Sequence, residues 1–196
     1  SKTLEILNKQ GIDDTKVFDV NDIKEQLLTL NEEREKLLLS ESISPIPLHK
    51  ALVLLEILSN FKDQDCYQHL RLACAKALVF SVSNLHFGPE VGIGKIKQDT
   101  PVVSVWLAEV SNIAKDIRNI HGKYYPTARA VLGDARNLGR ILDNNSIDAV
   151  ITSPPYPNEK DYTRTTRLES VLLGFVQEYR ADRALQALRR MAAPLA

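Results

Sequence analysis

The fold of the second half of this chain is decided by the stretch Ile147-Asp148-Ala149-Val150-Ile151-Thr152-Ser153-Pro154-Pro155-Tyr156. Residues 147 to 152 form a mainly apolar run of strand length, a pattern typical of a parallel sheet that is covered on both faces. The run ends in a serine, two prolines and a tyrosine. Because proline fixes the backbone angle φ, we expect a strand that stops at a rigid turn carrying polar groups.

A second strand end is expected just upstream. Ala128 to Leu132 is a short strand candidate that ends in Gly133-Asp134, and Ala135 to Leu142 has the pattern of a short helix. This β-α-β rhythm predicts a parallel sheet, in which ligands gather at the carboxyl ends of the strands. We therefore expect Asp134 and Ser153 to share one crevice, with Asp148 outside it at the start of its strand.

The first 126 residues are predicted to be mainly helical. A capping box of Asp22 and Glu25 starts a helix through about Ser40, and three further apolar-periodic stretches follow. They cover His49 to Asn60, Asp63 to about Ser83, and Val102 to Ile120. We expect the first three of these four helices to pack together.

The glycine-rich, basic stretch from Phe87 to Gln98 has three interpretations. Its glycines resemble those of a cofactor-binding loop. Such a loop follows a strand and leads directly into a helix, whereas here a helix precedes the stretch and Thr100-Pro101 separates it from the next helix. It is also consistent with a mobile loop that contacts nucleic-acid backbone through Lys95 and Lys97. The plain alternative is a connector without function.

Composition excludes little. The 25 Lys and Arg balance the 25 Asp and Glu, so overall charge does not indicate nucleic-acid binding, while 44% apolar residues support a folded core. There is no apolar run of about 18 residues, and we expect a cytoplasmic protein without membrane contact. Cys66 and Cys74 lack the spacing of metal ligands, so we expect two buried thiols and no metal site.

Residues 177 to 196 differ from the rest. They contain four Arg and six Ala but no Lys, and an apolar stripe from Ala181 to Met191 predicts a terminal helix. The chain is therefore divided into a helical domain or insertion over 1–126, an α/β segment over 127–176, and a compositionally distinct helical tail over 177–196.

The serine-diproline-tyrosine turn suits chemistry on an exocyclic base amine. The lone pair of such an amine is delocalised into the ring, so methyl transfer needs acceptors that favour a tetrahedral nitrogen outside the base stack. Ser153 supplies a hydroxyl oxygen and Pro154 a carbonyl oxygen, and Pro155 helps to fix both. Tyr156 offers a face on which an extruded base can stack.

The motif pair resembles a known family. Val131 to Ala135 followed by Ile147 to Tyr156 is similar to the S-adenosylmethionine-dependent DNA amino-methyltransferases, and the Ser-Pro-Pro-Tyr form resembles their cytosine-N4 branch more than the adenine-N6 branch. The resemblance implies that the turn surrounds the target amine and that Asp134 binds the adenine of the methyl donor. Asp134 as a simple helix cap fits the sequence about as well.

The resemblance also implies a fold and DNA contacts. The expected fold is α/β: a mostly helical N-terminal two-thirds, then a short β-α-β piece of a Rossmann-like methyltransferase sheet, then a C-terminal helix. Asp161 to Glu169 resembles the segment that follows the catalytic turn in the family, where Arg164 and Arg167 are expected to meet phosphate.

Family elements are missing before Asp134. There is no strand followed by Phe-x-Gly-x-Gly for the methionine part of the donor, and no acidic residue for its ribose. We therefore expect an internal fragment or one half of a split restriction-modification methyltransferase, inactive alone, with a second polypeptide or second copy supplying the missing sheet. A catalytically dead DNA-binding or assembly module and an RNA amine methyltransferase are the alternatives.

Overall fold

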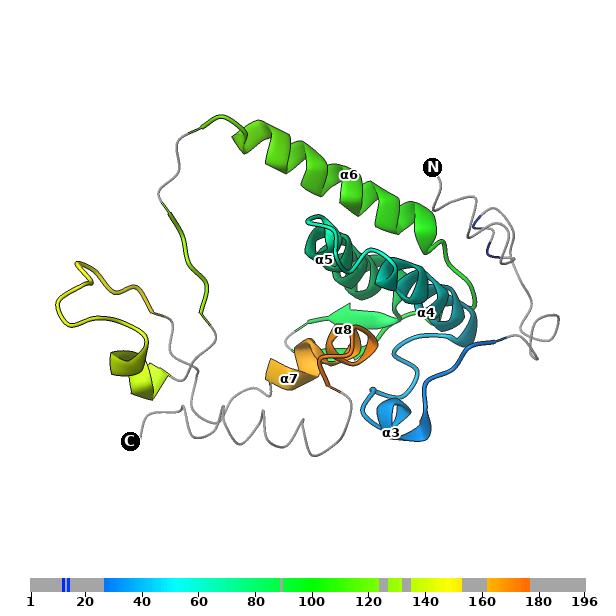
Figure 1. Ribbon diagram of the computed structural model, residues 1–196. Coiled ribbons are helices and arrows are strands. Elements are labelled where there is room, and N and C mark those ends of the chain that lie inside the picture. Colours follow the sequence, from blue (N-terminus) through cyan, green and yellow to red (C-terminus); the bar gives the residue numbers. More distant parts are fainter. Residues whose placement is uncertain are drawn as a thin grey trace.

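The computed structural model describes residues 12, 14, 27–88, 90–123, 127–131, 135–152 and 162–176. Three helices form most of its body: α4 (Pro45–Ser59), α5 (Tyr67–Ala77) and α6 (Val103–Ile120). Figure 1 shows α5 between the other two, with α6 running along one side. These helices correspond to three of the four that periodicity predicts, so that part of the sequence prediction is confirmed.

Small and apolar side chains explain how the helices pack. Pro45 occupies the first turn of α4, where its missing N–H costs nothing, so the proline pair starts the helix instead of breaking it. On α5 the buried residues Ala73, Cys74 and Ala77 are small, and α5 packs closely against α6. Trp106 of α6 is buried, and its indole N–H donates to the Leu70 carbonyl at 3.1 Å. The helices are therefore held by both packing and a specific hydrogen bond.

A π-helical turn and a hairpin follow α5. The π-helix η2 (Leu78–Val82) leads into β1 (Leu85–Phe87), which pairs antiparallel with β2 (Val91–Ile93). Buried Asn84 fixes the junction, because its amide donates to the Glu41 carbonyl at 2.9 Å and its side-chain oxygen accepts from the Lys97 backbone N–H at 2.9 Å. The stretch expected as a loop is thus largely an ordered hairpin.

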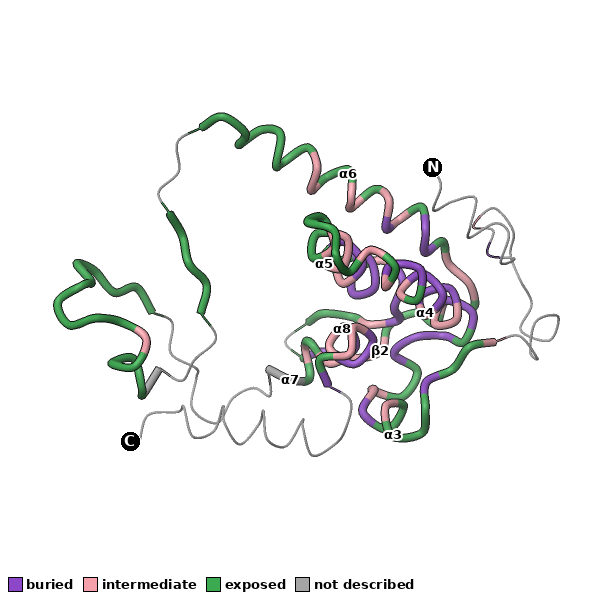
Figure 2. The backbone as a smooth tube through the Cα atoms, in the orientation of Figure 1, coloured by how far each residue is buried: buried purple, intermediate pink, exposed green. Residues whose placement is uncertain are grey.

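The chain returns to this body near its end. The short helices α7 (Tyr162–Thr165) and α8 (Arg167–Leu172) lie beside the hairpin, and α8 packs against η2 (Figure 1). Leu168, Val171, Leu172 and Val176 are buried in the same core as α4, α5 and α6. Figure 2 shows the buried backbone concentrated in these elements.

The helix predicted from Asp22 to Ser40 is confirmed only over four of its described residues. Residues 27–31 are not helical, and α3 covers Glu32–Glu35 only. Asn31 starts it, since its side chain accepts from the Arg34 backbone N–H at 2.9 Å. Leu37 and Ile43 then turn into the core through non-helical backbone. Burial of these side chains therefore overrides the helical pattern.

The predicted β-α-β unit is also not formed in the described residues. Residues 127–131 and 147–152 contain no strand, and Ala135–Arg140 forms the 3₁₀ helix η3. The backbone polar groups and side chains of a strand need neighbours, and here both 127–131 and 147–152 are exposed (Figure 2). The described sheet is the two-stranded antiparallel hairpin, so the fold is α/β only in a coarse sense and mainly helical.

Of the two cysteines expected to be buried, only one is buried. Cys74 is buried, which raises the pKa of its thiol to about 12, whereas Cys66 is exposed.

Among the described residues, no helix has the length and apolar character needed to cross a membrane. No group of three or more His, Cys, Asp or Glu side chains in the same residues is placed to hold a metal ion.

Candidate functional site

The predicted catalytic turn lies outside the described residues. This applies to Ser153, Pro154, Pro155 and Tyr156, and also to Asp134 and the C-terminal tail from 177. The structure does describe the two flanks of the turn, which end at Thr152 and begin again at Tyr162. These flanks differ strongly in their surroundings.

The upstream flank is uncovered. Val150 is 80% exposed and Ile151 is 100% exposed. This segment therefore presents two adjacent large apolar side chains to solvent. A segment of this kind is stabilised by neighbours on both sides, and Figure 1 shows it projecting away from the helices.

The downstream flank is anchored by two arginines. The Arg34 guanidinium donates to the Val171 carbonyl at 2.5 Å, and that of Arg71 donates to the Leu173 carbonyl at 2.7 Å. Both carbonyls belong to the end of α8, where free acceptors and partial negative charge favour a cation. Arg71 also lies over the ring of Phe175, with its guanidinium carbon 4.7 Å from the ring centroid. The segment after the turn is therefore fixed to α3 and α5.

Sequence reasoning missed Arg34 and Arg71. They lie 137 and 102 residues from their acceptors, and neither belongs to a local motif. A basic residue in a helix is ordinarily solvent-exposed, so its residue type carries no signal of such a role. Their function follows only from the tertiary contacts.

The structure brings two of the predicted nucleic-acid regions together. Arg164 of α7 lies 3.5 Å from the Glu90 carboxylate at the tip of the hairpin. Lys95 and Lys97 follow the other end of β2, so the hairpin connects cations that are about 70 residues apart in sequence. The ion pair is exposed, so it is weak and readily exchanged for another anion.

The four cations differ in availability. Lys95 is exposed, whereas the Lys97 ammonium donates to the Ser81 and Ser83 carbonyls, each at 2.7 Å. Partial burial lowers the pKa of Lys97. Arg167 is half-buried at the start of α8. Lys97 thus stabilises the end of η2, a role that its predicted DNA contact did not include.

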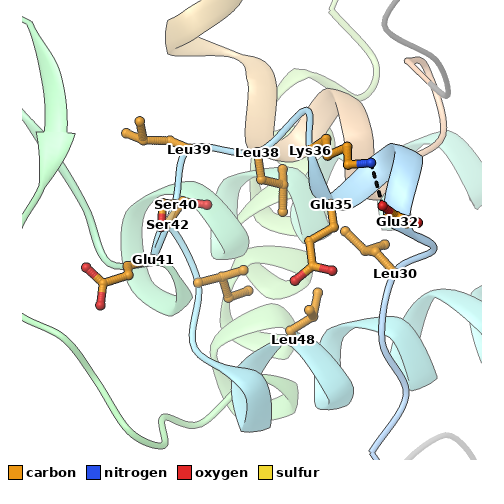
Figure 3. Close-up of a pocket in the computed structure, with 11 residues that line it drawn as sticks. Leu30, Glu32, Glu35, Lys36, Leu38, Leu39, Ser40, Glu41, Ser42 and Leu48 are labelled. Atoms are coloured by element: carbon orange, nitrogen blue, oxygen red, sulfur yellow. Dashed lines mark hydrogen bonds and ion pairs between the residues drawn. The ribbon is translucent and has the colours of Figure 1, made fainter.

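A pocket of about 420 Å³ lies on a different part of the body. It is lined by α3, the turns that follow it and the start of α4, and Figure 3 shows Glu35 and Leu48 facing each other across it. Glu32, Glu35 and Glu41 give it acidic character, although Lys36 pairs with Glu32 at 2.5 Å. Carboxylates repel phosphate, so this pocket is unsuited to a nucleic-acid backbone. None of the residues predicted for catalysis or DNA contact lines it.

Comparison with known proteins gives one match. The Type II methyltransferase M.BsoBI of Geobacillus stearothermophilus is 43% identical to this chain over 65 residues. The match covers 32% of this chain and 13% of that protein, so the chain spans only a small part of the length of its relative. No protein-family model matches the chain, and no solved structure matches it. Over about a third of its length the chain is thus similar to a methyltransferase.

Proposed function

We propose that this chain is a segment of an S-adenosylmethionine-dependent DNA methyltransferase that acts on an exocyclic base amine, with cytosine N4 favoured. The observation that carries the proposal is the Ser-Pro-Pro-Tyr sequence directly after the apolar run 147–152. The Ser153 hydroxyl oxygen and the Pro154 carbonyl oxygen hold the amine by accepting hydrogen bonds from its N–H groups, and Tyr156 stacks on the extruded base. Similarity to a Type II methyltransferase over 65 residues supports the methyltransferase part of the proposal.

The anchored flank gives the helical body a part in this activity. A catalytic turn works only if its acceptors are held in a fixed position, because small displacements of reacting groups cost rate. Tyr162 to Val176 begins six residues after Tyr156 and is fixed by Arg34 and Arg71. We therefore propose that the helical body fixes the downstream end of the turn through this segment.

The other end requires a covering sheet. Val150 and Ile151 are exposed. In a strand they would point to opposite faces, and a strand that is apolar on both faces is suited to the inside of a sheet rather than to its edge. We propose that further strands come from another segment of the natural protein, a second polypeptide or a second copy. Sedimentation equilibrium distinguishes the second copy, since this chain would then form a dimer that Ile151→Lys dissociates.

Methyl transfer by the natural protein that contains this chain tests the proposed activity. Tritiated S-adenosylmethionine is supplied with DNA or with RNA, and the product is digested and its nucleosides identified by mass spectrometry. N4-methylcytosine from DNA is expected, and Ser153→Ala should lower kcat by about 100-fold, the effect of losing one preorganised polar contact in the transition state. Tyr156→Phe should retain more activity than Tyr156→Ala, because it keeps the stacking face.

The matched control is Ser111→Ala on the exposed side of α6, which should leave the rate unchanged. If only the RNA were methylated, the substrate would be RNA and not DNA. A natural protein that binds DNA but transfers no methyl group, and whose DNA affinity is unchanged in Ser153→Ala, would favour the catalytically dead module. Transfer that is insensitive to Ser153 and Tyr156 would contradict the assigned site.

A further inference from the structure

Two phenylalanines form an exposed pair beside the hairpin. Phe80 of η2 and Phe87 of β1 have ring centroids 5.9 Å apart and planes tilted by 37°. Phe80 is 71% exposed and Phe87 is 42% exposed. Leaving large aromatic surface in water forgoes the free energy gained by burial, so a contiguous pair of this kind marks an interaction surface.

The backbone holds this pair firmly. Phe80 lies in a π-helical turn, a rare conformation that occurs frequently at functional sites. The turn is closed by the Ser83 backbone N–H, which donates to the Leu78 carbonyl at 2.9 Å, and by the Lys97 ammonium on the Ser81 and Ser83 carbonyls. Phe87 is fixed by its pairing with Val91 in the hairpin. The two rings are therefore presented on a rigid support.

The surroundings of the pair are positively charged. The Lys97 ammonium lies at the carbonyl of the residue next to Phe80, and exposed Lys95 belongs to the loop that follows the hairpin. Glu90 at the hairpin tip pairs with Arg164, and Asp99 pairs with Lys50. Cations next to flat apolar rings complement a partner that combines anionic groups with π-faces.

We propose that Phe80 and Phe87 form a stacking surface for unpaired bases of DNA, next to phosphate contacts made by Lys95 and Arg164. The inference rests on the proposed function and deepens it, since it names the form of DNA that this surface recognises. In an intact duplex the faces of the bases are covered by their neighbours, so exposed rings reach them only where the stack is open. Extrusion of a base for methylation opens the stack in this way.

Fluorescence anisotropy at low salt tests the inference with the chain itself. The probes are a labelled intact duplex, the same duplex with a bulge of three unpaired cytosines, and the corresponding single strand. We expect the bulged and single-stranded probes to bind at least fivefold more tightly than the duplex. Phe80→Ala should remove most of this preference, since base–aromatic stacking contributes at least about fivefold in affinity.

Two further variants separate stacking from folding and charge. Phe87→Leu keeps apolar contact with the hairpin but loses the aromatic face, so it should also lower the preference while circular dichroism stays unchanged. Ile117→Ala removes exposed apolar surface from α6 and should change nothing. Lys95→Gln should weaken all three probes to a similar extent and flatten the dependence on salt.

The outcomes separate this inference from the proposed function. Equal affinity for the three probes, or an unchanged preference in Phe80→Ala and Phe87→Leu, would overturn the stacking surface, and methyl transfer by the natural protein would be unaffected by that result. Binding of no probe at all would also overturn the stacking surface, whereas the proposed function is decided by methyl transfer in the natural protein. Burial of the pair by another polypeptide in the natural assembly, shown by protection of Phe80 from solvent there, would overturn the stacking surface alone.

Discussion

The two flanks of the predicted catalytic turn contain similar side chains in opposite environments. Val171 in α8 is fully buried, whereas Ile151 is fully exposed. The difference comes from where each segment finds its neighbours. Val171 packs on helices whose apolar stripes are encoded locally, but a strand such as 147–152 needs other strands at its edges. The comparison teaches that α8 finds its neighbours in the helical body, while a strand over 147–152 would need neighbours that the described residues do not supply.

The largest expected effect on the free energy of unfolding is the difference between a substitution in α8 and one in the exposed segment before the turn. Leu172→Ala removes a side chain buried in the core by α8 and should lower the free energy of unfolding by about 2 to 5 kcal/mol, since both transfer and cavity terms are lost. Leu142→Ala in the exposed segment should change it by less than about 0.5 kcal/mol. Urea unfolding followed by Trp106 fluorescence measures both. Equal effects would mean that the exposed segment packs on the body in solution.

Breaking a buried ion pair should give the next largest loss of stability. The Lys50 ammonium is almost fully buried and lies 2.8 Å from the Asp99 carboxylate and 3.8 Å from that of Asp14. Asp99→Ala should cost about 3 kcal/mol, because the buried Lys50 charge then loses its nearer carboxylate. Asp148→Ala, in the exposed segment, is the control and should be neutral. A stable Asp99→Ala variant would show that Lys50 is hydrated.

Arg71 tests the anchoring of the downstream flank. Arg71→Lys keeps the charge but loses the planar fork that reaches the Leu173 carbonyl while lying over Phe175. Hydrogen exchange of residues 162–176 should then speed up by about tenfold or more, the effect of losing a hydrogen bond to a charged group. Arg118→Lys on exposed α6 is the matched control. Unchanged protection would mean that apolar burial alone fixes α8.

The same contrast explains what the sequence could predict. Apolar periodicity located α4, α5 and α6 because their buried faces follow the 3.6-residue repeat. It failed for α3, where Leu37 and Ile43 enter the core through turns. The hairpin was missed because its strands are three residues each and its glycines favoured a loop.

The candidate site was predicted only in part. The Ser-Pro-Pro-Tyr turn is local in sequence, so its chemistry can be proposed from residue types, although its placement stays a prediction. The contacts of Arg34 and Arg71 join segments that are distant in sequence, and they leave no pattern in the sequence. The Phe80–Phe87 pair depends on a π-helical turn, which leaves no pattern either. The proximity of Arg164 to the hairpin is likewise a product of the fold.

The smallest effect concerns pH and the start of the helical body. His49 Nδ1 accepts the Leu28 backbone N–H at 3.0 Å, which requires the neutral imidazole. Partial burial, and then the charge of Lys50, lower the pKa of His49 below its usual value of 6.5. Because folding favours the neutral form, this stabilisation is fully present above pH 6.5 and is lost as the pH falls through the lowered pKa.

Unfolding free energies measured between pH 8 and pH 5 should therefore fall more steeply for the natural chain than for His49→Gln. Glutamine keeps an acceptor oxygen for the Leu28 N–H but does not titrate, so the difference between the two proteins should shrink towards acid pH. His69→Gln, at an exposed position of α5, is the control and should leave the slope unchanged. Parallel curves for the natural chain and His49→Gln would mean that protonation of His49 does not break its contact with Leu28, and that residues 27–31 are held to α4 by apolar burial of Leu30 instead.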